Sequence, residues 1–318
     1  MISQNVDYAE YLLRKGEVVA IPTETVYGLA ANAFNEQAVA KIFEIKKRPF
    51  FNSLIIHLKS VKDLSKVAQQ VPQLAKDLAQ AFWPGPLTLI LPKKPIISDL
   101  VTGGKNTVAI RVPNHPKALR LLGQLNFPLA APSANPFGTI SPTCAQHVED
   151  YFGDTLEFVL DGGACENGIE STIVGFENEQ AIIYRLGAIK IEEIEKVVGK
   201  VTIKNHDSEN PTAPGMLLKH YAPKSNMVLS DNILETMKEF QGKKIALLLT
   251  KTDIKLDSND VVIEKICNNE DYETAAKNLY AALRKLDAEN AEVIIAEKCS
   301  PIGLGLSIND RLYRASQK

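Results

Sequence analysis

A run of polar residues follows a short apolar segment near the start of the chain. The apolar residues 18–21 precede Thr23, Glu24 and Thr25, and a tyrosine and a glycine complete the segment. The apolar run is typical of a buried strand. Polar groups at its end would each cost about 1–3 kcal/mol if they were buried without partners. We therefore expect them to face a cavity. The alternative is a strand-to-helix turn that Thr25 caps.

Two cations form a second candidate set. Lys46 lies near the end of residues 36–47, a segment predicted to be a helix, and Arg48 follows directly after it. Cations there commonly stabilise the end of a helix through its dipole. Together, the planar fork of an arginine and the point charge of a lysine also suit a polyphosphate. We expect both side chains to be exposed, so alanine at either position should abolish activity and leave the fold intact.

Further polar side chains lie on or beside apolar strands. Ser133 and Asn135 are two residues apart, so both would point the same way in an extended segment. Arg111 ends the alternating strand 107–111, where it pairs with either a protein carboxylate or a substrate. His57 lies inside another strand, where a hydrogen-bonded core histidine is the more common case.

These groups together favour one type of chemistry. They are rich in hydroxyls, amides and cations and poor in general bases, and the sequence has no G-x-S-x-G, H-E-x-x-H or Walker motif. Such a set suits catalysis by positioning and charge neutralisation, as in transfer at phosphorus.

Length and composition limit the class of protein. The 318 residues predict two domains, and 45% hydrophobic and 23% charged residues are ordinary for a globular protein. A formal charge of −2 argues against a strongly cationic nucleic-acid binder but leaves a local basic pocket open. The four scattered cysteines argue against a zinc site or a disulfide framework. Without a signal segment or an apolar span, we expect a cytoplasmic protein with no membrane association.

The first 199 residues predict a mixed α/β domain. We expect helices over residues 6–14, 36–47, 60–69, 72–82, 143–152 and 190–198. We expect strands over residues 17–22, 53–58, 87–91, 107–112, 128–131, 157–161, 171–176 and 180–186.

A polar linker and a second domain follow. Residues 200–225 contain a polar run at 206–211 and a Pro-Gly turn at 214–215. Beyond them, strands and helices alternate, which predicts a parallel sheet in a small Rossmann-like domain. We expect strands at 226–229, 244–249, 260–265 and 292–296, and helices at 231–240, 271–288 and 304–315. Because no G-x-G-x-x-G follows its first strand, dinucleotide binding is not expected.

Several motifs, in order, resemble the YrdC-like domain. They are Pro-Thr-Glu-Thr-Val-Tyr-Gly at 22–28, Lys-x-Arg-Pro at 46–49, Val-Ala-Ile-Arg-Val-Pro at 108–113, Pro-Ser-Ala-Asn at 132–135, Ser-Pro-Thr at 141–143 and Glu-Ser-Thr at 170–172. The two-domain branch, the L-threonylcarbamoyl-AMP synthases, is similar through Pro-Gly-Met at 214–216, His-Tyr-Ala-Pro at 220–223, Gly-Leu-Gly-Leu at 303–306 and Asp-Arg-Leu at 310–312. The resemblance covers almost the whole chain.

The resemblance implies a fold and an activity. Residues 1–199 would form a YrdC-like twisted mixed sheet with a large basic cavity, 200–225 a linker and lid, and 226–318 the smaller domain. The implied enzyme is a nucleotidyltransferase that converts L-threonine, bicarbonate and ATP into threonylcarbamoyl-AMP and pyrophosphate. Mg²⁺ would arrive with ATP, with no organic cofactor. A downstream tRNA threonylcarbamoyl-transfer complex would use the product to modify the adenosine next to the anticodon.

The resemblance also implies roles for individual residues. The L-threonine contacts would be Thr25, His57, Arg111, Ala131 (through its backbone) and Ser171. The ATP contacts would be Lys46, Arg48, Asn52, Thr107, Ser133, Asn135, Ser141, Arg185 and Tyr221, of which Lys46 and Arg48 would also be catalytic. Tyr221 would lie over the nucleotide as part of the lid. This chain departs from the family at Lys47, where a small residue is usual, and at Phe50-Phe51, where a polar pair is more common.

Two alternatives remain at this point. One is a non-enzymatic RNA-binding module that uses the same basic cavity, against which the acidic overall balance counts. The other is a related carbamoyl-adenylate-forming enzyme that acts on a different acceptor.

Overall fold

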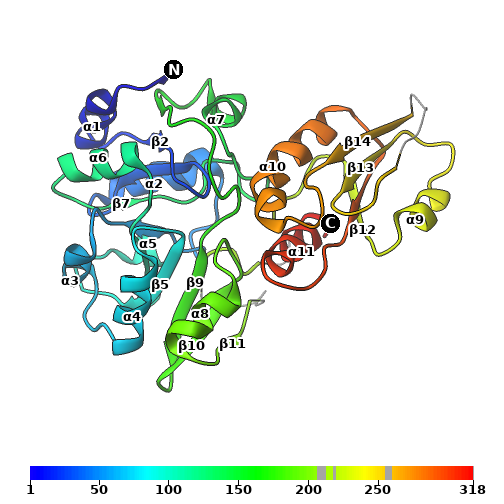
Figure 1. Ribbon diagram of the computed structural model, residues 1–318. Coiled ribbons are helices and arrows are strands. Elements are labelled where there is room, and N and C mark those ends of the chain that lie inside the picture. Colours follow the sequence, from blue (N-terminus) through cyan, green and yellow to red (C-terminus); the bar gives the residue numbers. More distant parts are fainter. Residues whose placement is uncertain (206–212, 218–219, 255–259, 318) are drawn as a thin grey trace.

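Two sheets organise the computed structural model, which describes residues 1–205, 213–217, 220–254 and 260–317 (Figure 1). The predicted polar run at 206–211 lies outside these residues. The first sheet belongs to the N-terminal domain and the second, smaller sheet to the C-terminal domain, as the sequence predicts. No helix in the described residues is long and apolar enough to cross a membrane.

The first domain is built on a mixed sheet of eleven strands, in the order β1-β8-β2-β3-β7-β4-β6-β5-β9-β10-β11. The strands are β1 (Ile2–Ser3), β2 (Val19–Ile21), β3 (Gly28–Asn32), β4 (Ile55–His57), β5 (Leu87–Pro92), β6 (Thr107–Arg111), β7 (Leu129–Ala130), β8 (Val159–Leu160), β9 (Thr172–Glu177), β10 (Gln180–Arg185) and β11 (Thr202–Ile203). The alternation predicted in β6 is present, because Val108 and Ile110 enter the main core while Ala109 lies in a separate cluster.

The helices of the first domain pack on its sheet in two separate hydrophobic cores. Its helices are α1 (Val6–Arg14), α2 (Glu36–Lys46), α3 (Leu64–Val67), α4 (Gln73–Phe82), α5 (Asp99–Thr102), α6 (Pro116–Gln124), α7 (Ala145–Phe152) and α8 (Ile191–Val198), with a 3-10 turn at Val61–Asp63. The main core includes residues of α2, α4, α7 and α8, whereas α1 and α6 pack on a separate core with β2, β3 and β7. Next to Ala109, the apolar cluster is completed by Ala213 and Met216 of the linker.

The first polar motif lies in a turn between two strands. β2 and β3 pair antiparallel, with Ile21 opposite Gly28. The alternative in which Thr25 caps a helix is therefore wrong, because the segment after the motif is a strand. The sequence did not predict β3, whose small residues Gly28, Ala30 and Ala31 carry little strand propensity. It also missed α6 and three short elements, β1, β11 and α5.

The second domain has the predicted parallel sheet, in the order β12-β15-β13-β14. Its elements are β12 (Asn226–Ser230), α9 (Ile233–Glu239), β13 (Ile245–Leu249), β14 (Val261–Lys265), α10 (Tyr272–Ala288), β15 (Val293–Glu297) and α11 (Leu304–Ala315). Ala276, Leu279, Leu283 and Leu286 form the predicted buried face of α10. Helices α10 and α11 lie on the side of this domain that faces the first domain (Figure 1).

Candidate active site

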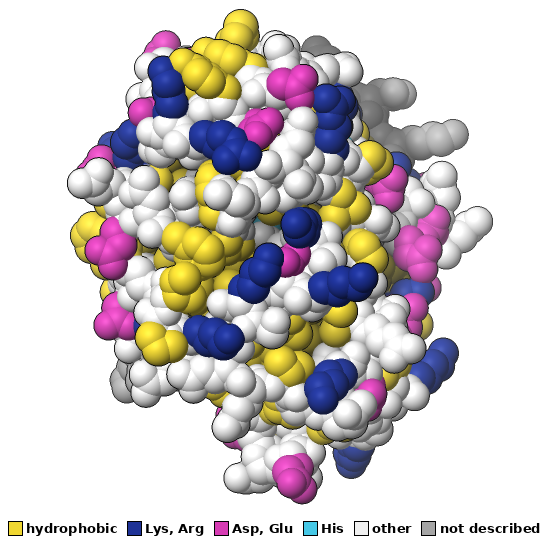
Figure 2. Space-filling model, turned by 90° about the vertical axis from the view of Figure 1, so that its left-hand side faces the viewer, with side chains coloured by type: hydrophobic (Ala, Val, Ile, Leu, Met, Phe, Trp, Pro, Cys, Tyr) yellow, Lys and Arg dark blue, Asp and Glu magenta, His cyan; other side chains and the backbone are white. Residues whose placement is uncertain are grey.

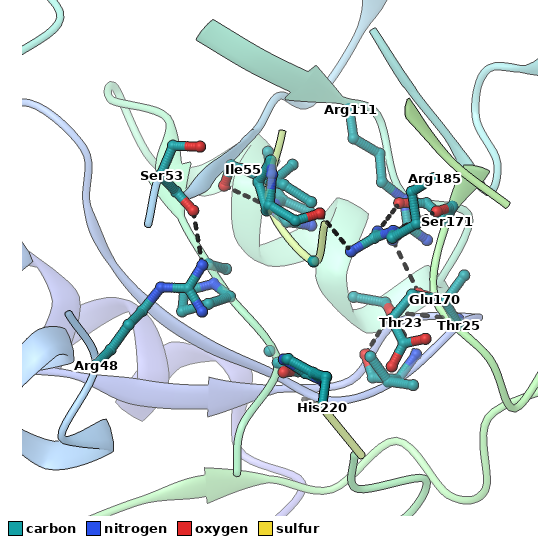
Figure 3. Close-up of a pocket in the computed structure, with 18 of the residues that line it drawn as sticks. Thr23, Thr25, Arg48, Ser53, Ile55, Arg111, Glu170, Ser171, Arg185 and His220 are labelled. Atoms are coloured by element: carbon teal, nitrogen blue, oxygen red, sulfur yellow. Dashed lines mark hydrogen bonds between the residues drawn. The ribbon is translucent and has the colours of Figure 1, made fainter. Parts of the chain in front are cut away.

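One buried cavity lies on the linker side of the first sheet. Its wall combines the β2–β3 turn, β4, β6, the loop after β7, the start of β9, the end of β10 and the linker. The lining residues are Thr23, Thr25, Val26, Gly28, Arg48, Ser53, Ile55, His57, Arg111, Ala131, Pro132, Ser133, Glu170, Ser171, Arg185, Pro214, Gly215, His220 and Tyr221 (Figure 3). The free volume is about 50 Å³, far below the roughly 300–1,000 Å³ of pockets that hold drug-sized ligands.

Arg111 forms one end of this cavity. It is 4% exposed and lies beside His57, because β4 and β6 pair in parallel register. Its Nη1 donates to Thr25 Oγ1 at 2.8 Å and its Nε to the Gly85 carbonyl at 3.2 Å. Its Nη2 lies 2.6 Å from Oε1 of Glu24, a carboxylate that the sequence analysis did not select. Of the two partners that the sequence left open, the described structure therefore contains the protein carboxylate.

His57 is held as a neutral hydrogen-bond acceptor. Its Nδ1 lies 3.2 Å from the Ile55 carbonyl, which can only accept, so Nδ1 carries the proton. Burial, with the nearby charge of Arg111, lowers the pKa of His57 to about 3. The lone pair on Nε2 is then the free polar group of this ring.

Arg48 approaches the cavity from the side opposite Arg111 and Arg185 (Figure 3). Its Nη2 donates to Asn52 Oδ1 at 2.6 Å and to the Ser53 carbonyl at 2.8 Å, and its Nε donates to the Asn52 carbonyl. Burial, followed by repulsion from Arg185, lowers the pKa of Arg48. Asn52 thus reaches the site indirectly, as the group that orients this guanidinium.

Lys46 supports the loop after β7 rather than the cavity wall. Its Nζ donates to the carbonyls of Ser133 and Asn135. The loop turns sharply here, because the backbone N–H of Asn135 donates to the Ser133 carbonyl. Ser133 therefore lines the cavity. The side-chain amide of Asn135 points away from it and donates to the carbonyls of Pro136 and Thr139. Burial, with the charge of Arg48, lowers the pKa of Lys46 well below its ordinary value.

The expected exposure of the two cations is wrong. Lys46 is 1% exposed and Arg48 is 8% exposed, because each is enclosed by the backbone carbonyls to which it donates. Alanine at either position would leave buried carbonyl groups without donors, at about 1–3 kcal/mol each. The expectation that such variants keep the full stability of the fold therefore does not hold.

Ser171 and Arg185 connect the sheet to the linker. Arg185 donates from Nε to the Ser171 carbonyl and from Nη2 to Ser171 Oγ, each at 3.0 Å. Its Nη1 lies 3.4 Å from the carbonyl of Pro214 in the linker. On the other side, Ser171 Oγ lies 2.7 Å from Thr88 Oγ1.

The second domain holds the linker over the cavity. Arg314 of α11 donates to the carbonyls of Gly215 and Leu217 at 2.7 and 2.6 Å. Tyr221 is 1% exposed, stacks on Tyr280 of α10 with ring centroids 5.6 Å apart, and lies 5.5 Å from the Arg311 guanidinium. Gly215, Leu217 and Tyr221 of the linker are thus held by helices of the second domain.

Glu170 joins the two domains beneath the linker. Its carboxylate accepts from Ser141 Oγ at 2.7 Å, from the Tyr280 hydroxyl at 2.9 and 3.0 Å, and from Arg311 Nε at 3.2 Å. Burial alone would raise the pKa of Glu170, but Arg311, Arg185 and the Ser141 hydroxyl outweigh it and lower the pKa. Ser141 therefore contacts this carboxylate and does not line the cavity.

The structure brings most, but not all, of the predicted residues to the cavity wall. The wall contains Thr25, His57, Arg111, Ala131, Ser171, Arg48, Ser133, Arg185 and Tyr221. Lys46, Asn52, Asn135 and Ser141 lie behind it, and Thr107 lies at the opposite end of β6 from Arg111.

Sequence reasoning missed several residues of this site. Thr23 and Glu24 were inside the first motif but received no role. Arg311 and Tyr280 were overlooked because both lie on helices of the second domain, more than 100 residues from Glu170. The available signal was the tail motif at 310–312, in which an acid and a base interrupt the apolar face of a helix.

The cations of the cavity differ from those of the surface. On the face of the first domain shown in Figure 2, lysine and arginine side chains are dispersed among hydrophobic and acidic ones. The cavity instead gathers Arg48, Arg111 and Arg185 with Glu170 as the one carboxylate in its described wall, while Glu24 lies outside the wall and pairs with Arg111. This local excess of positive charge is hidden in the net charge of −2 and suits anionic ligands.

Comparisons with known proteins agree with this geometry. Residues 11–187 match a family model described as "Telomere recombination", and residues 189–317 match one described as "Threonylcarbamoyl-AMP synthase, C-terminal domain". The chain is 40% identical to the threonylcarbamoyl-AMP synthase of Pyrococcus abyssi, over 96% of this chain and 92% of that protein. It is 42% identical to the Bacillus subtilis protein of the same name, over 97% and 92%.

A solved structure matches both domains. The crystal structure of P. abyssi Sua5 complexed with L-threonine superposes with a TM-score of 0.90 at 39% identity, covering 98% of this chain and 94% of that chain. Fold and cavity thus define a two-domain enzyme with a YrdC-like first domain. The chain belongs to the threonylcarbamoyl-AMP synthase family.

Proposed function

We propose that this chain catalyses the formation of threonylcarbamoyl-AMP and pyrophosphate from L-threonine, bicarbonate and ATP. The observation that carries the proposal is a cavity that has Arg111 on one side and Arg48 on the opposite side. A guanidinium is suited to an amino-acid carboxylate, and a second one to phosphate oxygens. The relative of known structure, which holds L-threonine, supports the first of these assignments.

The proposed reaction has two steps. The amine of threonine attacks carbon dioxide derived from bicarbonate, which forms an N–C bond and releases a proton. A carbamate oxygen then attacks the α-phosphorus of ATP. The bond between this phosphorus and the oxygen that bridges it to the β-phosphate breaks, and the electron pair of that bond leaves with pyrophosphate. Because a carbamate is short-lived in water, a closed cavity protects it until the second step.

In this proposal, the residues of the cavity position charge. Arg111, Thr25, His57, the Ala131 backbone and Ser171 bind threonine. Arg48, Arg185, Ser133 and Tyr221 contact the nucleotide directly, and Lys46, Asn52, Asn135 and Ser141 hold those contacts in place. Since about 50 Å³ cannot contain ATP, the linker opens to admit it and then closes.

We propose that Mg²⁺ enters with ATP. Among the described residues, no group of three or more His, Cys, Asp or Glu side chains could hold a metal ion. The oxygens of Glu170, the carboxylate in the described wall, are occupied by Tyr280, Ser141 and Arg311. The residues fit an ion held by phosphates, which would supply neutralisation of charge on the leaving pyrophosphate.

The product would be used outside this protein. A mixed anhydride of a carbamate and a phosphate is an activated carbamoyl donor, so we propose that a tRNA-modifying complex in the cytoplasm accepts it. The RNA-binding alternative is not favoured, because the cavity cations are buried by backbone carbonyls and the linker instead of facing an open groove.

Pyrophosphate release and product mass test the proposed function. Purified protein with ATP, Mg²⁺ and bicarbonate should release pyrophosphate only when L-threonine is added, and threonylcarbamoyl-AMP should form in equal amount. Release that does not depend on threonine would contradict the proposal. An equal rate with L-serine or L-valine would favour the alternative of a different acceptor.

A further inference from the structure

The hydrogen bonds of the β2–β3 turn fix the direction of a proton at the threonine end of the cavity. Thr23 Oγ1 lies 2.6 Å from the Val26 carbonyl, which can only accept, so the single hydroxyl proton of Thr23 is used there. The backbone amides of Thr25 and Val26, each 3.3 Å away, share one lone pair of the same oxygen, which leaves its other lone pair for a further donor. Thr23 therefore has no proton left to donate elsewhere.

This arrangement decides the role of Thr25. The two hydroxyl oxygens are 2.8 Å apart, and since the proton of Thr23 is committed, Thr25 is the donor in that contact. Arg111 donates to the Thr25 oxygen at 2.8 Å, as a guanidinium must. The hydroxyl proton of Thr25 is thus used in the bond to Thr23. Toward the cavity, Thr25 Oγ1 presents only a lone pair, so it can accept a hydrogen bond there but cannot donate one.

A second acceptor lies at the same end. His57 Nε2 also carries a lone pair, because Nδ1 holds the proton that is shared with the Ile55 carbonyl. His57 lies opposite Arg111 in the paired strands, and both residues line the cavity. The end therefore offers one guanidinium donor and two acceptors, which complements an amino acid that brings one carboxylate together with ammonium and hydroxyl donors.

We propose that Thr23 is a positioning residue for amino-acid recognition, which acts by holding the Thr25 hydroxyl as an acceptor for a donor group of the substrate. This inference rests on the proposed function, in which the cavity binds L-threonine. Without the Thr23 oxygen, the Thr25 proton loses its acceptor and turns toward the substrate donor. Thr23 also lines the cavity, but its hydroxyl proton is donated to the Val26 carbonyl and its oxygen accepts from Thr25, so we expect its effect on the substrate to be transmitted through Thr25.

Four variants test this inference by calorimetric titration with L-threonine: Thr23→Val, Thr23→Ser, Thr25→Val and the double variant Thr23→Val with Thr25→Val. We expect Thr23→Val to weaken threonine binding about tenfold, in line with one lost hydrogen bond. Thr23→Ser keeps the hydroxyl and should bind within about threefold of wild type. Because Thr23 acts through Thr25, the double variant should bind no more weakly than Thr25→Val alone.

Two controls separate positioning from folding. Thr250→Val makes the same exchange at a fully buried threonine of the second domain and should leave threonine binding unchanged. The maximal rate of Thr23→Val at saturating threonine, and its affinity for ATP, should stay within about twofold of wild type. If Thr23→Val does not fold, Thr23→Ala removes the same hydroxyl and takes its place throughout.

The outcomes divide cleanly. Unchanged threonine binding in Thr23→Val, failure of Thr23→Ser to restore it, or additive losses in the double variant would overturn the inference. An equal loss of threonine and ATP binding would also overturn it, because that would indicate collapse of the turn. Absence of threonine binding in the wild-type protein would instead contradict the proposed function itself.

Discussion

The two ends of the cavity are held in place by different parts of the chain. Arg111 and His57 lie on neighbouring strands of one sheet, and Thr25 lies in the turn that joins two more. At the other end, Arg48 is held by Asn52 and Ser53, and Tyr221 of the linker packs on α10. The proposed threonine end is thus built within the first domain, whereas the proposed nucleotide end also includes a linker residue that the second domain holds.

This difference separates a preformed site from an assembled one. Strand register positions Arg111 and His57 without contacts from the linker, so we expect these two residues to be in place before any ligand binds. The nucleotide end depends on contacts of residues far apart in sequence, such as Arg314 with Gly215. We therefore expect changes in the second domain to affect nucleotide binding and to spare threonine binding.

Loss of Arg111 should have the largest effect. Arg111→Ala removes the expected carboxylate contact and should weaken threonine binding by roughly 100-fold or more, since hydrogen bonds to charged groups contribute about 1.5–3 kcal/mol each. It also leaves Glu24, 2% exposed, without its 2.6 Å partner. Breaking a buried pair in this way destabilises a fold by about 3–5 kcal/mol. Threonine titration and urea unfolding measure the two effects.

A paired variant separates these two losses. Arg111→Met combined with Glu24→Gln removes both charges at similar volume, so stability should recover while threonine binding stays lost. Recovery of binding in the double variant would show that Arg111 does not contact the substrate.

Release of the linker should have the next largest effect. Arg314→Met removes the donors to Gly215 and Leu217 and should raise the KM for ATP about tenfold, while threonine affinity stays within twofold. Arg120→Met is the matched control, because Arg120 forms a surface pair with Asp7 and is 59% exposed. Equal changes in both affinities would contradict the division into two ends.

The buried histidines predict a dependence of stability on pH. The pKa values of His57 and His220 are lowered to about 3 by burial, from an ordinary value of 6.5. The folded state then binds fewer protons than the unfolded chain below pH 6.5, so stability is complete above that pH and falls as the pH drops toward 3. At pH 5, each histidine should lower the free energy of unfolding by about 2 kcal/mol relative to its value above pH 6.5.

Unfolding free energies at pH 7.5 and pH 5.0 test this dependence. His57→Asn keeps a donor for the Ile55 carbonyl but does not titrate, so its loss of stability between these pH values should be about 2 kcal/mol smaller than that of wild type. An equally steep loss in the variant would mean that His57 is protonated in the folded state.

The smallest effect concerns the residue between the two cations. Lys47 ends α2 in the left-handed conformation, with φ 51° and ψ 43°. Glycine adopts this conformation without strain, so Lys47→Gly should stabilise the fold by about 0.5–1 kcal/mol and leave threonine binding unchanged. Lys47→Ala keeps the Cβ and should not stabilise it. Thermal unfolding distinguishes the two variants.

The sequence predicted the two ends of the cavity unequally. The alternation of β6 and the motif before β3 are local patterns, so Arg111 and Thr25 could be selected from them, whereas His57 of β4 was selected through the family resemblance. The carboxylate opposite Arg111 was harder to choose, because Glu24 lies three residues past the end of β2 and no periodicity indicates the direction of its side chain.

At the nucleotide end, local patterns were insufficient. Lys46 was interpreted as an exposed cation because the carbonyls that enclose it come from residues 133 and 135. Arg48 is enclosed by the carbonyls of Asn52 and Ser53 in the loop that follows it, and the sequence pattern did not specify how that loop folds back. Similarly, the contacts of Glu170 with Tyr280 and Arg311 span 110 and 141 residues. Such partners depend on how the domains pack, which composition and spacing do not specify.

Titration of L-threonine in the absence of nucleotide tests the central claim most directly. If Arg111 and its neighbours form a preformed amino-acid site, threonine should bind to wild-type protein without ATP, and Arg111→Ala should abolish that binding. Arg48→Ala, at the opposite end, should change it less than about threefold. A wild-type protein that binds threonine only with a nucleotide present, or an equal loss in both variants, would contradict the account.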